Sequence, residues 1–124
     1  MTHSENLKKL SKDLTKEAPR SPYERIAGFA LLARSIDKCR ASIVGTVGEY
    51  MFNCPLDKKL FSFKGLDAME YRAFIETGAT DEEIGKWVHE HGDPKTDEEI
   101  EESSDSFDGK MDSIVKDDKE SFAK

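Results

Sequence analysis

The chain has few cysteines and no long apolar run. Only two cysteines, Cys39 and Cys54, occur in its 124 residues, and in a reducing compartment we expect both to be free thiols rather than a disulfide. No window approaches the roughly 18 apolar residues of a membrane span, and the first residues lack the apolar segment of a signal peptide. We therefore expect a cytoplasmic protein without a membrane span.

The chain also lacks an excess of positive charge. Its formal net charge is −7, and the acidic excess lies in residues 93–124, because residues 1–92 carry equal numbers of acidic and basic side chains. Nucleic acids and anionic membranes are bound through basic surfaces. We therefore expect neither as a partner. The length of 124 residues allows one domain with a modest core.

The apolar periodicity is helical in almost every segment. A capping pattern at Ser21, Pro22 and Glu24 predicts a helix that begins at Pro22. Because residues 26–33 are almost all apolar or small, we expect this helix to lie in the centre of the domain and to end near Gly45.

Shorter helices are predicted on both sides of the central one. Leucines near the N-terminus indicate a short helix or an arm, and further helices are expected after Pro55, Asp67 and Thr80, with the Thr80 capping box recurring at Thr96. Residues 45–55 hold the only strand-like stretch, which is too short for a sheet, so we expect an ordered loop. The predicted fold class is all-α, a small orthogonal bundle of five or six short helices.

Composition divides the chain into three segments. Residues 1–20 are expected to form the arm or short helix, and residues 21–102 the helical core domain. Beyond Ser103 the apolar pattern gives way to serines and acidic residues, so residues 103–124 are expected to form an acidic, largely flexible tail. The remaining apolar residues of this tail predict at most a weak helix through Met111, Ile114 and Val115.

A series of positions in the core domain resembles a known family. The matching positions are Arg20-Ser21-Pro22, Gly28, Arg34, Ile36-Asp37-Lys38, Arg40, Gly45, Tyr50, Asp57, Phe63, Gly78, Asp81-Glu82-Glu83-Ile84, Trp87, Gly92 and Glu98-Glu99-Ile100. Over about residues 20–100 the chain resembles the bacterial family catalogued as domain of unknown function 5069. The resemblance implies a bacterial helical domain and carries no reaction with it. The family tends to have Trp-Asn where this chain has Ser103-Ser104.

A cluster of charges next to the apolar run is the candidate site. Asp37 is three residues from both Arg34 and Arg40, a spacing that lets it pair with either on a helix. Two interpretations are open: a structural network of ion pairs that fixes helix against loop, or a cationic pocket for a carboxylate or phosphate. The predicted binding residues are Arg34, Asp37, Lys38, Arg40, Tyr50 and Asp57.

Other patterns fit known site chemistry less well. Cys39 lies between Lys38 and Arg40, a setting that would favour a reactive thiol, but adjacent residues of a helix point apart. Cys54 shows no better pattern for a nucleophile. The residues with metal-ligand side chains match no metal motif in their spacing: Cys39, Cys54, His89 and His91. We expect neither a metal nor a cofactor.

The charge cluster leads to two functional hypotheses. The first is a non-enzymatic binding or interaction module that recognises an acidic small molecule or protein segment. The alternative is a small enzyme that uses Asp37 or Asp57 as general acid or base, with Arg34 and Lys38 as anion binders. One open pocket lined by Arg34, Lys38, Tyr50 and Asp57 would favour the enzyme. The oligomeric state is open, and a dimer would use the apolar residues Met51 and Phe52.

Overall fold

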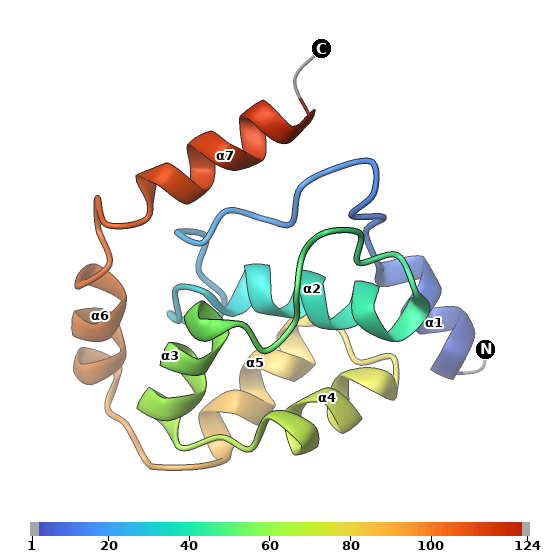
Figure 1. Cartoon of the computed structure of the whole chain (residues 1–124). Coiled ribbons are helices and arrows are strands. Elements are labelled where there is room, and N and C mark those ends of the chain that lie inside the picture. The colour runs from blue at the N-terminus through green and yellow to red at the C-terminus, as the bar shows by residue number, and fades with distance from the viewer. Residues whose placement is uncertain (1–2, 123–124) are drawn as a thin grey trace.

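The structure, a computed structural model, describes residues 3–122, and every regular element in that range is a helix. Seven helices follow one another along this part of the chain (Figure 1): α1 (His3–Leu10), α2 (Leu32–Val44), α3 (Pro55–Lys64), α4 (Ala68–Glu76), α5 (Asp81–Glu90), α6 (Asp97–Asp105) and α7 (Asp112–Phe122). The all-α prediction is confirmed, with seven helices instead of five or six. None of these helices is long and apolar enough to cross a bilayer.

Helix α2 is the centre of the fold. It packs against α1, α3, α4 and α5, and its residues Leu32, Ala33, Ile36 and Cys39 are completely buried. Figure 1 shows α3, α4 and α5 on one side of α2, and the segment of residues 11–31 with α7 on the other. Removing the apolar side chains of α2 from water is the main favourable contribution of this packing.

Side chains cap the helices where the sequence predicts it. Asp67 accepts hydrogen bonds from two backbone N–H groups at the start of α4. Thr80 and Thr96 form capping boxes at the starts of α5 and α6. Gly45 ends α2 in a left-handed conformation and donates its N–H to the Ala41 carbonyl. These local signals set the residues at which α5 and α6 begin.

The prediction of a helix that begins at Pro22 is wrong, because α2 begins only at Leu32. The hydroxyl oxygen of Ser21 accepts the N–H of Tyr23, and its carbonyl oxygen accepts the N–H of Glu24. These bonds form a single turn, and no helix follows it. Three residues between that turn and α2 have positive φ angles, namely Ala27 (53°), Gly28 (85°) and Leu31 (73°). A helix cannot pass through left-handed residues. The part of the apolar run that precedes α2 is therefore irregular, and Phe29, Ala30 and Leu31 are its buried residues.

The segment after Ser103 contains regular structure. Helix α6 continues to Asp105, and α7 extends the weak helix that was expected near Met111. Ser104 and Met111 are both buried. The Ser104 hydroxyl accepts a hydrogen bond from the Ala30 N–H at 2.9 Å and donates to the Gly28 carbonyl at 2.8 Å. These contacts join α6 to the segment before α2, while the mobility of the C-terminal residues stays a prediction.

Replacing Ser104 with alanine tests this attachment. Ser104→Ala leaves the buried Ala30 N–H without its acceptor, so we expect the free energy of unfolding to fall by about 1–3 kcal/mol. Ser106→Ala is the matched control, because Ser106 donates only to the exposed Ser103 carbonyl, and it should change stability by less than about 0.5 kcal/mol. Urea denaturation of both variants measures the difference. Equal stability of the two variants would contradict the attachment of α6 through Ser104.

Candidate functional site

The predicted charge cluster lies on α2 and is buried. Arg34, Asp37, Lys38 and Arg40 expose between 3% and 6% of their surface. An unpaired charge in such a position costs several kcal/mol, so each of these side chains needs a partner. Each has one, and the partners come from four different segments of the chain.

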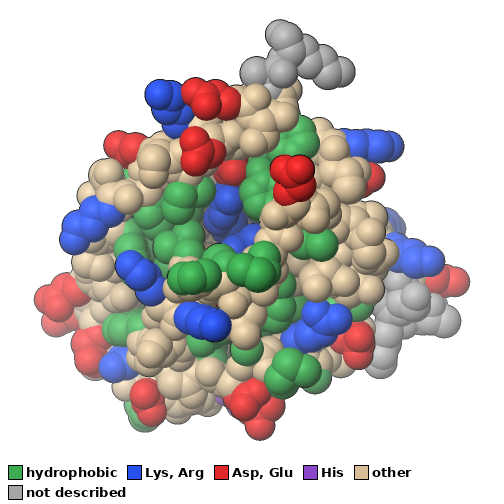
Figure 2. Space-filling model, viewed as in Figure 1, with side chains coloured by type: hydrophobic (Ala, Val, Ile, Leu, Met, Phe, Trp, Pro, Cys, Tyr) green, Lys and Arg blue, Asp and Glu red, His purple; other side chains and the backbone are tan. Residues whose placement is uncertain are grey.

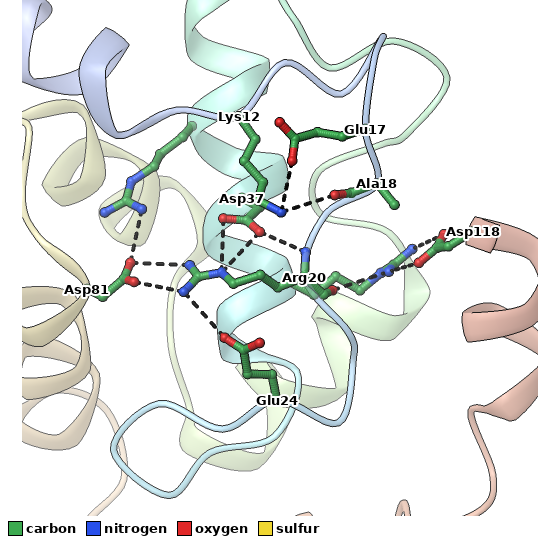
Figure 3. A network of polar contacts seen from close by, with 10 residues as sticks. Lys12, Glu17, Ala18, Arg20, Glu24, Asp37, Asp81 and Asp118 are labelled. Carbon is green, nitrogen blue, oxygen red and sulfur yellow. Dashed lines mark hydrogen bonds and ion pairs between the residues drawn. The ribbon is translucent and has the colours of Figure 1, made fainter. Parts of the chain in front are cut away.

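Arg20, in the segment before α2, connects α2 with α5 (Figure 3). Its backbone N–H donates to Asp37 Oδ2 at 2.8 Å, and its Nε lies 3.1 Å from the same oxygen. Its two terminal nitrogens donate to the two oxygens of Asp81 at 2.8 and 3.3 Å. Arg40 Nη1 donates to Asp81 Oδ1 at 2.9 Å, and Arg40 Nη2 donates to the Ala79 carbonyl at 2.9 Å. Asp81 is therefore shared by two arginines.

These contacts correct the predicted pairing of Asp37. Asp37 was expected to pair with Arg34 or Arg40 on its own helix, but it pairs with Arg20. The short carboxylate of Asp37 meets the neighbouring segment directly, whereas the two long guanidinium groups reach away from it to Asp118 and Asp81.

The arginines keep Asp81 ionised. Burial alone would raise the pKa of Asp81, but the hydrogen bonds and charges of Arg20 and Arg40 outweigh it and hold the pKa below its ordinary value of 3.8. Burial likewise lowers the pKa of Arg20, but the bonds to Asp81 and Asp37 more than compensate and raise it above its ordinary value. This part of the cluster therefore stays fully charged at neutral pH.

Lys38 faces the start of α3. Its Nζ lies 3.0 Å from Asp57 Oδ2 and 3.0 Å from Cys54 Sγ. The same Asp57 oxygen accepts the N–H groups of Asn53 and Cys54 at 2.9 and 3.3 Å, so it also closes the loop that leads into α3. Within residues 3–122, no group of three or more His, Cys, Asp or Glu side chains is placed to hold a metal ion.

Arg34 faces α7 and binds a carboxylate with both terminal nitrogens. Arg34 Nη1 lies 2.7 Å from Asp118 Oδ2, and Nη2 donates to Asp118 Oδ1 at 3.3 Å. The Tyr50 hydroxyl donates to the same Asp118 Oδ1 at 2.9 Å, and the Arg34 guanidinium lies 5.5 Å from the centre of the Tyr50 ring. Burial and the hydrogen bond to Asp118 raise the pKa of Tyr50 to about 12. The phenol therefore stays protonated and donates at neutral pH.

A groove of about 590 Å³ lies next to this contact. It is bounded by α7 on one side and by residues 14–15 and 48–50 on the other. Figure 2 shows Lys or Arg side chains lying deep between hydrophobic side chains below α7, in the same view as Figure 1. The residues that line the groove include Leu14, Arg34, Tyr50, Ile114, Asp118 and Phe122, together with the acidic Glu49 and Asp117.

The predicted site residues do not share one pocket. Arg34 and Tyr50 line the groove beside α7, whereas Lys38 and Asp57 form a separate pair at the start of α3. Lys38 and Asp57 do not line this groove, so it is not the pocket around all four residues that would have favoured an enzyme. The geometry instead matches a network of ion pairs with one carboxylate-binding position at its edge.

Comparison with known families agrees with the sequence resemblance and extends it. The model of a domain of unknown function, DUF5069, matches residues 16–123. The chain belongs to the DUF5069 family. The match continues beyond residue 100 and includes α7 with Asp118, so the α7 contact lies inside the DUF5069 domain. No curated protein matches the chain significantly.

Sequence reasoning missed three members of the DUF5069 charge network, Arg20, Asp81 and Asp118. Arg20 and Asp81 are among the positions that carry the family resemblance, so a signal was present, but Asp81 was interpreted only as part of a helix cap. Asp118 had no such signal, because it lies in an acid-rich segment next to Asp117. Pairs this distant in sequence cannot be found from local spacing.

The repeated capping sequence supplies a matched test of the Asp81 pairs. Asp81 and Asp97 occupy the same position after the two threonine caps, but Asp81 binds Arg20 and Arg40, whereas the Asp97 side chain is 99% exposed. Because Asp81 is itself 37% exposed, we expect Asp81→Asn to cost about 2 kcal/mol at pH 7 and Asp97→Asn less than about 0.5 kcal/mol.

The pH dependence of the Asp81→Asn effect follows from the lowered pKa. The Asp81 carboxylate stabilises the fold above the pKa of the unfolded chain, and this contribution is lost as the pH falls through the lower pKa of the folded state. The difference between wild type and Asp81→Asn should therefore be largest near neutral pH and shrink below about pH 4. Guanidinium denaturation from pH 7 to pH 3 measures it. A difference that stays constant with pH, or that Asp97→Asn reproduces, would rule out the arginine pairing as its cause.

Proposed function

We propose that this DUF5069 chain is a binding module that recognises a carboxylate of an acidic protein segment at Arg34 and Tyr50. The supporting observation is the carboxylate of Asp118, which receives two hydrogen bonds from Arg34 and one from the Tyr50 hydroxyl. Two parallel N–H donors match the geometry of a carboxylate and make this one of the stronger kinds of polar contact. Asp118 thus stands in for the carboxylate of a partner.

Helix α7 is the element that a partner replaces. None of its residues is buried, and it lies on the outside of the molecule along the segment of residues 11–31 (Figure 1). The other charge partners of α2 sit on elements that also contribute buried apolar residues, such as Leu60 of α3 and Ile84 of α5. The Arg34 pair is therefore the one that opens with the least loss of packing.

The face of α7 that lines the groove also indicates the shape of the partner. Ile114, Asp118 and Phe122 are four residues apart in succession, so they lie on one face of α7, and all three line the groove. A competing segment of the same pattern, an acidic side chain between two apolar ones on a helix, would make the same contacts. This is the helix-in-groove type of recognition, with the carboxylate fixing the register.

A peptide of residues 112–122 is the probe for this function. In full-length Asp118→Arg the repulsion between two arginines displaces α7, so we expect this variant to bind the peptide. The same peptide with asparagine at position 118 should bind at least about 10-fold more weakly, because it lacks the charge-assisted hydrogen bonds. Fluorescence anisotropy of the labelled peptides measures both affinities.

Two further variants are the controls for this test. Asp117→Arg makes the same change of charge at the neighbouring position but keeps Asp118 on Arg34, so it should bind the peptide much more weakly than Asp118→Arg. Arg34→Met in the Asp118→Arg chain should abolish the preference for the carboxylate peptide. Equal affinities for the two peptides, or binding that survives the loss of Arg34, would disprove the proposal. A thermal-shift titration of Asp118→Arg with succinate and phosphate tests whether a small anion is sufficient.

A further inference from the structure

A second polar cluster lies away from the groove, at the start of α3. Cys54 is the N-cap residue of this helix, and its backbone N–H donates to Asp57 Oδ2 at 3.3 Å. Lys38 Nζ, which comes from α2, lies 3.0 Å from Sγ and 3.0 Å from Asp57 Oδ2. One ammonium group from α2 therefore contacts both a sulfur and a carboxylate at the start of α3.

The two cysteines of the chain have opposite surroundings. Cys39 has no exposed surface, and burial raises the pKa of its thiol to about 12. Cys54 is only partly buried. The side chains of Lys38 and Asp57, which lie next to Cys54, are only 3% and 2% exposed. Cys39 is thus an inert, fully buried thiol, whereas Cys54 is partly exposed and lies next to a fixed ammonium group.

The sulfur of Cys54 accepts a hydrogen bond from the Lys38 ammonium group. A lysine in contact with a cysteine sulfur is one of the settings in which reactive cysteines are found. Asp57 fixes the position of the ammonium and is itself fixed by the N–H groups of Asn53 and Cys54. A sulfur, a charged neighbour in hydrogen-bond reach and a third group that orients this neighbour make up the arrangement of an activated nucleophile.

We propose that Cys54 is a nucleophilic thiol, positioned by Lys38 and Asp57, that exchanges with small disulfides. In this step Cys54 Sγ forms a bond to one sulfur of the disulfide, and the disulfide bond breaks. The proton of Cys54 passes to solvent, and the electron pair of the broken bond goes to the leaving sulfur, which departs as a thiolate and takes up a proton from solvent. Cys54 is oxidised to a mixed disulfide and the leaving sulfur is reduced, so the exchange balances without another oxidant.

The neutral disulfide 4,4′-dithiodipyridine is the probe, because each exchange releases a thiopyridone that absorbs light. In native wild type at pH 7 we expect one thiol to react at least about 10-fold faster than the thiols of the same chain unfolded in urea. Each rate is divided by the rate of glutathione in the same solution, which removes the effect of urea on the reaction itself. Cys54→Ser should remove this fast phase, and Cys39→Ala should keep it. A native rate equal to the unfolded rate overturns the proposal without any variant.

Lysine variants separate a positioning role of Lys38 from a merely structural one. Lys38→Met should slow the fast phase by about 10-fold or more, while Lys58→Met, which removes the same charge from an exposed position on α3, should leave it within about 2-fold. Lys38→Arg keeps the charge and should react faster than Lys38→Met. Circular dichroism checks that Lys38→Met is folded. If the folded variant reacts as fast as wild type, Lys38 does not activate Cys54 and the proposal fails.

Discussion

The pairing of buried charges on α2 with opposite charges from distant segments is the constraint on which the arrangement of this DUF5069 domain depends. Four ionisable side chains lie within two turns of its central helix, each in a position where an unpaired charge is unfavourable by several kcal/mol. Each is matched only when one particular segment is in place. Because desolvation offsets most of the attraction, such pairs contribute little net stability, but they disfavour every arrangement that leaves one of them open. The apolar core supplies the stability, and the charges fix how the segments lie against α2.

The pairs differ in how strongly their second member is attached. Asp57 and Asp81 lie in the first turns of helices whose apolar faces are buried, and Arg20 contacts three acidic residues at once. Asp118 belongs to a helix without a buried residue. Arg34 needs a paired carboxylate, and the helix that supplies it is loosely attached. This combination is the physical basis for exchanging Asp118 for the carboxylate of a partner. The same principle gives Lys38 its second role, because the ammonium that Asp57 holds in place also contacts the sulfur of Cys54.

The sequence predicts what is local and fails where the answer depends on distant residues. The capping boxes at Thr80 and Thr96 and the end of α2 at Gly45 were predictable, because the groups involved lie within one helical turn. The helix expected from Pro22 was wrong, since the positive φ angles of Ala27 and Leu31 come from tertiary packing and have no counterpart in residue type. Local preference gives way to packing in such segments.

The candidate site was predictable to the same extent. The residues of α2 that carry the charge could be identified, and Tyr50 and Asp57 were both predicted as binding residues, but the sequence did not assign Tyr50 to Arg34 or Asp57 to Lys38. The partners of these residues could not be identified, because they lie in distant segments. For Asp37, helical spacing suggested neighbours on the same helix. Asp118 escaped notice in a segment rich in acids, and Lys38 and Cys54 showed no relation until the fold placed the end of the loop beside α2.

Native-state hydrogen exchange of the full-length chain tests the central claim most directly. Because α7 is attached more weakly than the other elements that pair with α2, we expect its amides to exchange through a local opening of α7. The free energy of this opening should lie several kcal/mol below the opening free energy of the slowest amides of α2. We also expect that Asp118→Asn lowers the opening free energy of α7 while α2 is hardly affected. If α7 and α2 instead open together with one free energy, in wild type and in Asp118→Asn alike, α7 is an inseparable part of the fold and Asp118 cannot be exchanged for a partner.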